Sequence, residues 1–234
     1  MEKSRERFDA FAKDYEFVLE KSIGRYGGNS SYYSKKRVDE IRRYYHRVGR
    51  VEPRRIIEFG CGTGKNLELL RSLFPSAELF GVDVSSRILE VARNRSISNC
   101  SIFHYDGLCL PSEVNNLDLV VVVNVFHHIP RNLHLQTLEL LYNTMEKGAI
   151  LALFEHNPAN PLTRKIVRDC PMDVGVELLS AEYTNTALTK EKWRDIETRY
   201  ILFFPPLLSI GSSLERFMPW LPLGAQYAVF AMKQ

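Results

Sequence analysis

The residues best suited to chemistry in this chain come directly after short apolar runs. Carboxylates, glycines and histidines make up most of the set: Glu58, Gly60, Gly62, Gly64, Asp83, Asp106, Asn124, His127, His128, Glu155 and His156. Glycines that follow a parallel strand let a ligand approach the backbone and leave free N–H groups at the start of the next helix. The pattern therefore predicts a ligand site built from the ends of several strands.

The loop Gly60–Gly64, in the stretch RIIEFGCGTGK, has the spacing G-x-G-x-G. A dinucleotide site requires G-x-G-x-x-G, and a P-loop requires a lysine followed by serine or threonine, whereas Lys65 is followed by Asn66. Glu58, two residues before the first glycine, would repel a phosphate and attract a cation. The loop therefore favours a nucleotide-like ligand that carries positive charge in place of phosphate.

Two further carboxylates describe the rest of this ligand. Asp83 ends the run ELFGVD about 20 residues past the loop, where an acid accepts hydrogen bonds from ribose hydroxyls. Asp106, in YDG, is placed to accept from an adenine amine, and Gly107 leaves room for the ring. An adenosine-like ligand with positive charge is required, and S-adenosylmethionine, with its sulfonium and ammonium, fits.

The elements that must position these residues alternate regularly from Arg55 onward. Strands are expected at 55–60, 78–84, 100–106, 117–126 and 147–155, and amphipathic helices at 65–74, 85–95 and 131–146. Two more strand-like runs follow at 199–204 and 226–233. Apolar strands alternating with amphipathic helices indicate an α/β fold with a parallel sheet covered on both faces. Upstream, 5–21 reads as one helix with an apolar face and 35–50 as a second, basic helix.

The segments EFGCGTGKN, GVDVSSRILEVAR, YDG and LDLVVVVNVFHHI together resemble the successive motifs of class I S-adenosylmethionine-dependent methyltransferases. The resemblance implies a Rossmann-like, mostly parallel sheet of seven strands, with the last strand antiparallel between strands five and six. It makes YILFF and YAVFAM strands six and seven. It also implies that residues 1–50 form an N-terminal helical lid on a methyltransferase domain at 51–234, with a substrate-side insertion at 156–199 and an apolar connection at 205–224.

The resemblance assigns cofactor-binding roles residue by residue. The methionine and ribose portion would lie on the glycine loop and Glu58, the ribose on Asp83, and the adenine beside Val84 and Asp106. Asn124 would offer its backbone carbonyl to the methionine ammonium, and Phe126 would line the pocket. The whole set is Glu58, Gly60, Cys61, Gly62, Gly64, Asp83, Val84, Asp106, Gly107, Asn124 and Phe126.

Methyl transfer requires the acceptor to be held about 3 Å from the methyl group, with water excluded and a base present if the acceptor is a hydroxyl. His127, His128 and His156 are the expected catalytic residues, since they follow the fourth and fifth strands. Each also has a structural interpretation, in a helix cap, in a turn or facing water. Glu155 and Asn157 are expected to hold a polar acceptor.

The acceptor side is less clearly indicated. Tyr15, Tyr32 and Tyr33 would close over the substrate from the lid, or pack structurally. The basic helix would dock an anionic acceptor or form a solvated face. HNPANPLTRKIVRDCPMD and FMPWLPLGAQYAVFA are similar to a bacterial subgroup associated with surface-glycan and lipid-linked sugar genes. The predicted reaction is O-methylation of a sugar-like or lipid-linked acceptor. The alternatives are N- or C-methylation of a small metabolite, or a non-catalytic scaffold that binds the cofactor.

Composition limits the remaining classes. The 234 residues are 45% hydrophobic and 25% charged, with a net charge of +3, which is typical of a globular protein and too weakly basic to favour nucleic acid. The cysteines show no C-x-x-C spacing, so we expect no metal and a cytoplasmic location. The apolar segment 205–224 leaves two interpretations open: contact with the inner face of a membrane or a lipid tail, or burial against the lid or in a homodimer.

Overall fold

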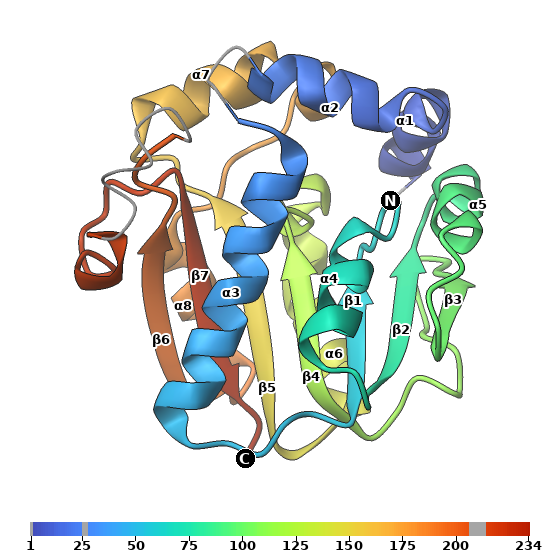
Figure 1. Cartoon of the computed structure of the whole chain (residues 1–234), viewed down its shortest axis with the longest axis vertical. Helices are drawn as coiled ribbons and strands as arrows, with labels where there is room; N and C mark the ends of the chain where they lie inside the picture. The colour runs from blue at the N-terminus through green and yellow to red at the C-terminus, as the bar shows by residue number, and fades with distance from the viewer. Residues whose placement is uncertain (1, 25–27, 206–213) are drawn as a thin grey trace.

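The computed structural model describes residues 2–24, 28–205 and 214–234, and in that part of the chain a seven-stranded sheet has the order β3-β2-β1-β4-β5-β7-β6 (Figure 1). The strands are β1 (Arg55–Phe59), β2 (Glu78–Asp83), β3 (Cys100–His104), β4 (Leu117–Val123), β5 (Met145–His156), β6 (Arg194–Ile201) and β7 (Gln226–Met232). Strands β1 to β5 pair in parallel, and β7 runs antiparallel between β5 and β6. The predicted fold class and sheet arrangement are confirmed.

Helices cover both faces of the sheet because the side chains of its central strands are apolar on both faces and must be removed from water. One face of the sheet is covered by α3 (Ser30–Val48), α4 (Lys65–Leu73) and Leu89 of α5 (Ser86–Asn94). These elements pack on alternate strand residues, such as Ile56 and Phe230. On the other face, α6 (His134–Thr144) and α8 (Ala181–Lys190) pack on the intervening residues, such as Ile57 and Val229. This double burial explains the continuous apolar runs of the sequence.

The sixth strand lies earlier than predicted. We expected it at YILFF, but β6 is Arg194–Ile201, and Leu202 has a left-handed φ of 63°. The strand lies at the edge of the sheet, where only alternate side chains turn inward. Ile196 and Tyr200 pack against the core while Glu197 and Arg199 form ion pairs with Arg47 and Glu40 of α3, so no apolar run marks the strand.

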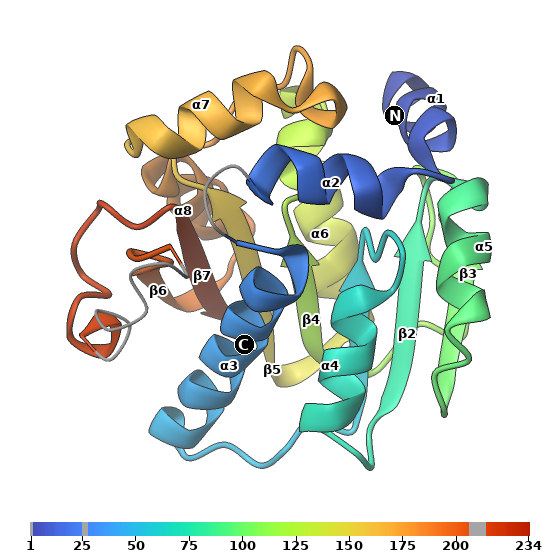
Figure 2. The same ribbon diagram turned by 45° about the horizontal axis from the view of Figure 1, so that its top comes forward.

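The N-terminal region forms two short helices where one was predicted. They are α1 (Glu2–Phe11) and α2 (Tyr15–Gly24), separated by a turn at Ala12–Asp14. With α7 (Pro161–Asp169), they lie across the carboxyl edge of the sheet (Figure 2). The basic helix α3 lies against the face of the sheet and shares its core. Of the helices described within residues 1–50, only α1 and α2 therefore lie where the predicted lid would lie, over the carboxyl edge of the sheet, whereas α3 belongs to the sheet's core.

Four 3-10 turns complete the described elements: η1 (Phe126–His128), η2 (Arg131–Leu133), η3 (Pro171–Asp173) and η5 (Glu215–Phe217). The apolar connection at 205–224 is described only in part, because 206–213 lie outside the described residues. In its described part Phe217 and Trp220 are exposed. Among the described helices, none has the length and apolar content needed to cross a bilayer.

Phe230 of β7 anchors α3 on the sheet, and removing its ring tests this packing. Tyr44 of α3 stacks on it, with ring centroids 4.0 Å apart and an interplanar angle of 7°, and Phe230 is fully buried. Phe230→Ala should lower the free energy of unfolding by about 3–5 kcal/mol, because it leaves a cavity and removes the stacked pair. Phe17→Ala, at a ring that is 69% exposed, is the matched control and should change it by less than about 0.5 kcal/mol. Equal losses in urea denaturation would contradict this account.

Candidate active site

A cavity of about 300 Å³ lies at the carboxyl edge of the sheet, between the ends of β1, β2 and β4 and the helices α1, α2 and α7. It is in this position because neighbouring parallel strands end there and leave a crevice that the crossing helices cover. Its lining includes most of the predicted site: Glu58, Gly60, Cys61, Gly62, Asp83, Val84, Asn124, His127, His128, His156, Tyr15 and Tyr33.

The glycine loop forms because β1 must end beside β2 and turn sharply. Gly60 and Cys61 donate their backbone N–H groups to the carbonyl of Val82, at 2.8 and 2.9 Å. Gly60, Gly62 and Gly64 all have left-handed φ values, of 75°, 52° and 78°. A Cβ on Gly60 would collide with Val125, so this position tolerates only glycine. Gly64 does not line the cavity; it begins α4 beside Ala92 of α5.

Asp83 closes the loop from the end of β2. Its carboxylate accepts from Gly62 N at 3.0 Å and from Ser85 N at 2.9 Å. Burial raises the pKa of Asp83 while these backbone donors act to lower it. Since an ionised carboxylate has about four acceptor sites, two hydrogen bonds leave capacity for two hydroxyl donors from a ligand. Asp9 of α1 accepts from Ser85 Oγ at 2.6 Å, which ties the covering helix to this turn.

Glu58 is a buried carboxylate with one oxygen unsatisfied. Asn66 donates to its Oε1 at 2.6 Å, while its buried Oε2 has no hydrogen-bond partner among the described residues. Burial raises the pKa of Glu58 to about 8, against the lowering effects of Asn66 and Arg37. A ligand cation placed beside Oε2 would restore the ionised form.

Arg37 of α3 also lines the cavity, and sequence reasoning did not select it from the basic helix. Its Nε donates to Gln226 Oε1 at 2.8 Å, and Gln226 Nε2 donates to Asn124 Oδ1 at 3.2 Å. Burial lowers the pKa of Arg37 to about 10, although Glu58 acts to raise it, so the guanidinium is charged at neutral pH. Asn124 has a left-handed φ of 55° where β4 ends, a strained conformation of the kind that occurs at functional sites.

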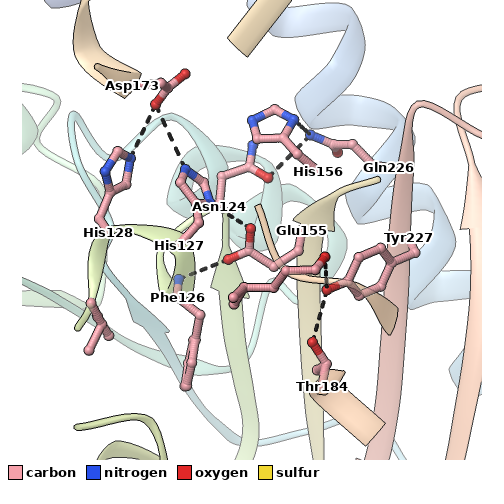
Figure 3. A network of polar contacts seen from close by, with 12 residues as sticks. Asn124, Phe126, His127, His128, Glu155, His156, Asp173, Thr184, Gln226 and Tyr227 are labelled. Carbon is pink, nitrogen blue, oxygen red and sulfur yellow. Dashed lines mark hydrogen bonds and ion pairs between the residues drawn. The ribbon is translucent and has the colours of Figure 1, made fainter. Parts of the chain in front are cut away.

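Four side chains from three segments form what we call the histidine–carboxylate cluster: His127, His128, Glu155 and Asp173 (Figure 3). Glu155, at the end of β5, accepts from Phe126 N at 2.8 Å and approaches His127 Nδ1 at 2.5 Å. Asp173 Oδ1, from η3, lies 3.3 Å from His128 Nε2 and 3.7 Å from His127 Nε2. Both His127 and Glu155 are buried.

The charges of this cluster follow from its contacts. Although burial opposes the charged form, Glu155 and then Asp173 raise the pKa of His127 to about 10. Burial, followed by the effect of His127, lowers the pKa of His128, and the same two causes lower the pKa of His156 to about 4. Burial acts to raise the pKa of Asp173, but the two neighbouring histidines lower it below its usual range. The cluster thus concentrates negative charge that attracts a cation.

The remaining predicted residues do not line the cavity: Gly64, Asp106, Gly107, Phe126, Tyr32, Glu155 and Asn157. Asp106 Oδ1 accepts from Leu108 N and Cys109 N, at 2.8 and 3.0 Å. Asn157 Nδ2 donates to the carbonyls of Pro222 and Gly224, so it fixes the chain that enters β7.

Sequence reasoning missed Asp173, Gln226 and the apolar side of the cavity. That side comes from α2, α7 and the chain after β6: Leu19, Ile23, Leu162, Ile166, Val167, Leu202, Phe203 and Phe204. No motif marks these residues. The only signal was the amphipathic pattern of PLTRKIVRD, whose apolar positions 162, 166 and 167 lie at helical spacing.

Comparison with known proteins gives this site its context. Residues 56–148 match the family model described as a methyltransferase domain. A trans-aconitate 2-methyltransferase of Rhodopseudomonas palustris is 32% identical over 106 residues, which cover 44% of this chain and 38% of that protein. The match therefore spans well under half of the curated relative's length.

Two solved structures share the fold over nearly the whole chain. A SAM-dependent methyltransferase from Archaeoglobus fulgidus has a TM-score of 0.69 at 18% identity, covering 94% of this chain and all of that one. The plantazolicin methyltransferase BpumL, solved in complex with SAH, has a TM-score of 0.68 at 17% identity, covering 100% and 98%. Residues 56–148 are thus similar to a methyltransferase domain, and the chain has the fold of these SAM-dependent methyltransferases.

The raised pKa of Glu58 makes stability depend on pH. Between about pH 4.5 and pH 8, Glu58 keeps a proton in the folded state that it has lost in the unfolded state. The stabilisation that comes from this protonated form is therefore fully present below pH 4.5 and is lost as the pH rises through 8. Glu58→Gln should remove up to about 1.4 kcal/mol per pH unit from the slope of unfolding free energy against pH in that window. Urea denaturation at several pH values measures it, with the exposed Glu146→Gln as control. Parallel curves for wild type and Glu58→Gln would show that Glu58 is ionised in the folded protein.

Proposed function

We propose that this protein is an S-adenosylmethionine-dependent methyltransferase. One observation supports this most: the cavity at the strand ends of a methyltransferase domain combines a glycine loop, a buried Asp83 and a buried Glu58 with an unsatisfied oxygen. Asp83 and the ionised form of Glu58 would repel a phosphate-bearing nucleotide, whereas a ribose and an ammonium would find acceptors. Trans-aconitate and plantazolicin, which appear in the names of two similar proteins, differ from each other, so neither name defines the acceptor of this chain.

The cofactor is proposed to lie along the ends of β1, β2 and β4. Its ribose hydroxyls would donate to Asp83, and its ammonium would lie beside Glu58 and the Asn124 carbonyl. Arg37 would pair with the methionine carboxylate, because it is a buried cation that already faces the cavity. Adenine would pack between Val84 and Ile88, both of which line the cavity. Asp106 and Gly107, which follow the neighbouring strand β3, are proposed to lie beside the outer edge of the adenine.

The acceptor is proposed to be a hydroxyl on a molecule with an apolar body, consistent with a lipid-linked molecule or an apolar sugar conjugate. The apolar side chains of α2, α7 and 202–205 support the apolar body, and the histidine–carboxylate cluster supports a reacting hydroxyl. In the transfer, the acceptor oxygen bonds to the methyl carbon, the C–S bond breaks with its electron pair on sulfur, and the hydroxyl proton leaves. His128 and His156 line the cavity and stay candidates for taking that proton, while both nitrogens of His127 face carboxylates.

N-methylation is the second candidate, because Asp173 presents a carboxylate that would hold an ammonium. Labelled cofactor incubated with matched alcohol and amine acceptors bearing one apolar tail would distinguish them. A product only from the amine would replace the O-methylation proposal. Contact with a membrane and a homodimer stay proposals that rest on the exposed Phe217 and Trp220.

Calorimetry with S-adenosylhomocysteine tests the cofactor proposal directly. Micromolar binding is expected, with none for NAD. Asp83→Asn should weaken the binding at least tenfold, or about 1.4 kcal/mol, because the ribose loses a charged acceptor. His46→Gln, on the exposed side of α3, is the control and should bind normally. Binding unchanged by Asp83→Asn would exclude the proposed cofactor geometry, and no binding to wild type would contradict both the methyltransferase and a scaffold that binds the cofactor.

A truncated ligand isolates the role of Arg37. Methylthioadenosine has the adenosine and sulfur of S-adenosylhomocysteine but no amino-acid carboxylate. Arg37→Gln should therefore weaken S-adenosylhomocysteine at least tenfold and leave methylthioadenosine within about twofold, since a charge-assisted pair contributes 1.4 kcal/mol or more. Asp83→Asn should weaken both ligands. If Arg37→Gln weakens both equally, Arg37 acts by holding Gln226 and the end of β4.

A further inference from the structure

We propose that the histidine–carboxylate cluster is a binding site for a divalent first-row transition metal, with His127 Nε2, His128 Nε2 and Asp173 Oδ1 as ligands. The three donor atoms lie within 4.8 Å of one another. Two imidazoles and one carboxylate form a donor set that suits Zn²⁺, Fe²⁺ or Co²⁺. The sequence predicted no metal because η3 follows η1 only after α6, β5 and α7, so no spacing motif joins the ligands.

The distances in the cluster favour a metal over direct hydrogen bonding. His127 Nε2 lies 3.7 Å from Asp173 Oδ1, which is too long for a hydrogen bond. That nitrogen is buried and has no hydrogen-bond partner in the described part of the chain. Ligand bonds of about 2.1 Å in tetrahedral geometry separate donors by about 3.4 Å. The observed separations from Asp173 Oδ1, 3.7 and 3.3 Å, lie on either side of this value.

The surroundings of His127 complete the site. Its Nδ1 lies 2.5 Å from a carboxylate oxygen of the buried Glu155, which fixes the ring with Nε2 turned toward Asp173 (Figure 3). A metal-bound histidine commonly donates its other nitrogen to such a carboxylate, which orients the ring and raises its basicity. A metal ion would displace the proton of His127, and the two carboxylates and two neutral imidazoles would then carry a charge of −2, which a divalent cation neutralises. All three ligand residues line the cavity, so the remaining coordination positions face it.

The role of the ion rests on the proposed methyltransferase function. A metal held here would bind the acceptor hydroxyl oxygen and lower its pKa. The proton then leaves to water, and the oxygen attacks the methyl carbon while the C–S bond breaks with its electron pair on sulfur. His128 is in this arrangement a ligand rather than a base.

Metal binding is testable without any acceptor. Protein freed of metal with a chelator is titrated with Zn²⁺ by calorimetry and with Co²⁺ by visible absorption. One equivalent should bind at micromolar or lower Kd, and the Co²⁺ complex should show ligand-field bands. Asp173→Asn and His128→Gln should each weaken binding at least tenfold, while the exposed His46→Gln should not change it.

The result that overturns the proposal is equally direct. If wild type binds neither ion, or if Asp173→Asn and His128→Gln bind as wild type does, the cluster is an imidazolium held between two carboxylates. Folding of each variant is checked by its thermal transition, and Asp173→Asn keeps the size of the side chain. S-adenosylhomocysteine binding, measured on the same preparations, separates the two proposals. If the protein does not bind S-adenosylhomocysteine, the proposed methyltransferase function is contradicted; if it binds this ligand but no metal, only the metal site is contradicted.

Discussion

The burial of charge at the carboxyl edge of the sheet is the constraint on which this structure depends. Glu58, Asp83 and Arg37 at the cavity, and Glu155 beside it, are all withdrawn from water, and the ionised form of each would be costly without a partner. Their partners come from different elements, so satisfying them fixes where those elements lie. Glu155 accepts from Phe126 N and faces His127, which holds the turn after β4 against β5. The site and the fold are therefore specified by the same contacts.

The parallel sheet was predictable because its physics is local. Strands buried on both faces must be apolar throughout, and the turns after them must be small where a neighbouring strand lies close, as Gly60 lies against Val125. The same reasoning placed Asp83 and Glu58 at the cavity. It failed for β6, since one face of this edge strand carries charged residues, such as Glu197 and Arg199, which form ion pairs with α3. It also failed at the turn between α1 and α2, where no glycine or proline interrupts the helical pattern.

The rest of the site depends on long-range contacts that no sequence spacing encodes. Asp173 reaches the histidines from a 3-10 turn, and Arg37 reaches the cavity from a helix that otherwise covers the sheet face. Arg37 could not be distinguished by its type, because it lies among several lysines and arginines, and Asp173 belongs to no recognised motif. What distinguishes them is burial, which is a property of the assembled fold. Asn157 shows the converse: it looked like a site residue, yet its amide binds backbone carbonyls that lead into β7.

The position of β7 has a consequence for the order in which the chain is assembled during synthesis. β5 is complete before α7, α8 and β6 are made, but its neighbour β7 comes after all of them. Until then β5 presents an unpaired apolar edge, and β6 has no strand beside it. An elongating chain therefore carries a template for wrong strand pairing through most of its second half, of the kind that chaperones cover. Gln226, which accepts from Arg37, then arrives with the strand that ends this exposure, so the arrangement of Arg37 at the cavity and the closed sheet are completed by the same segment.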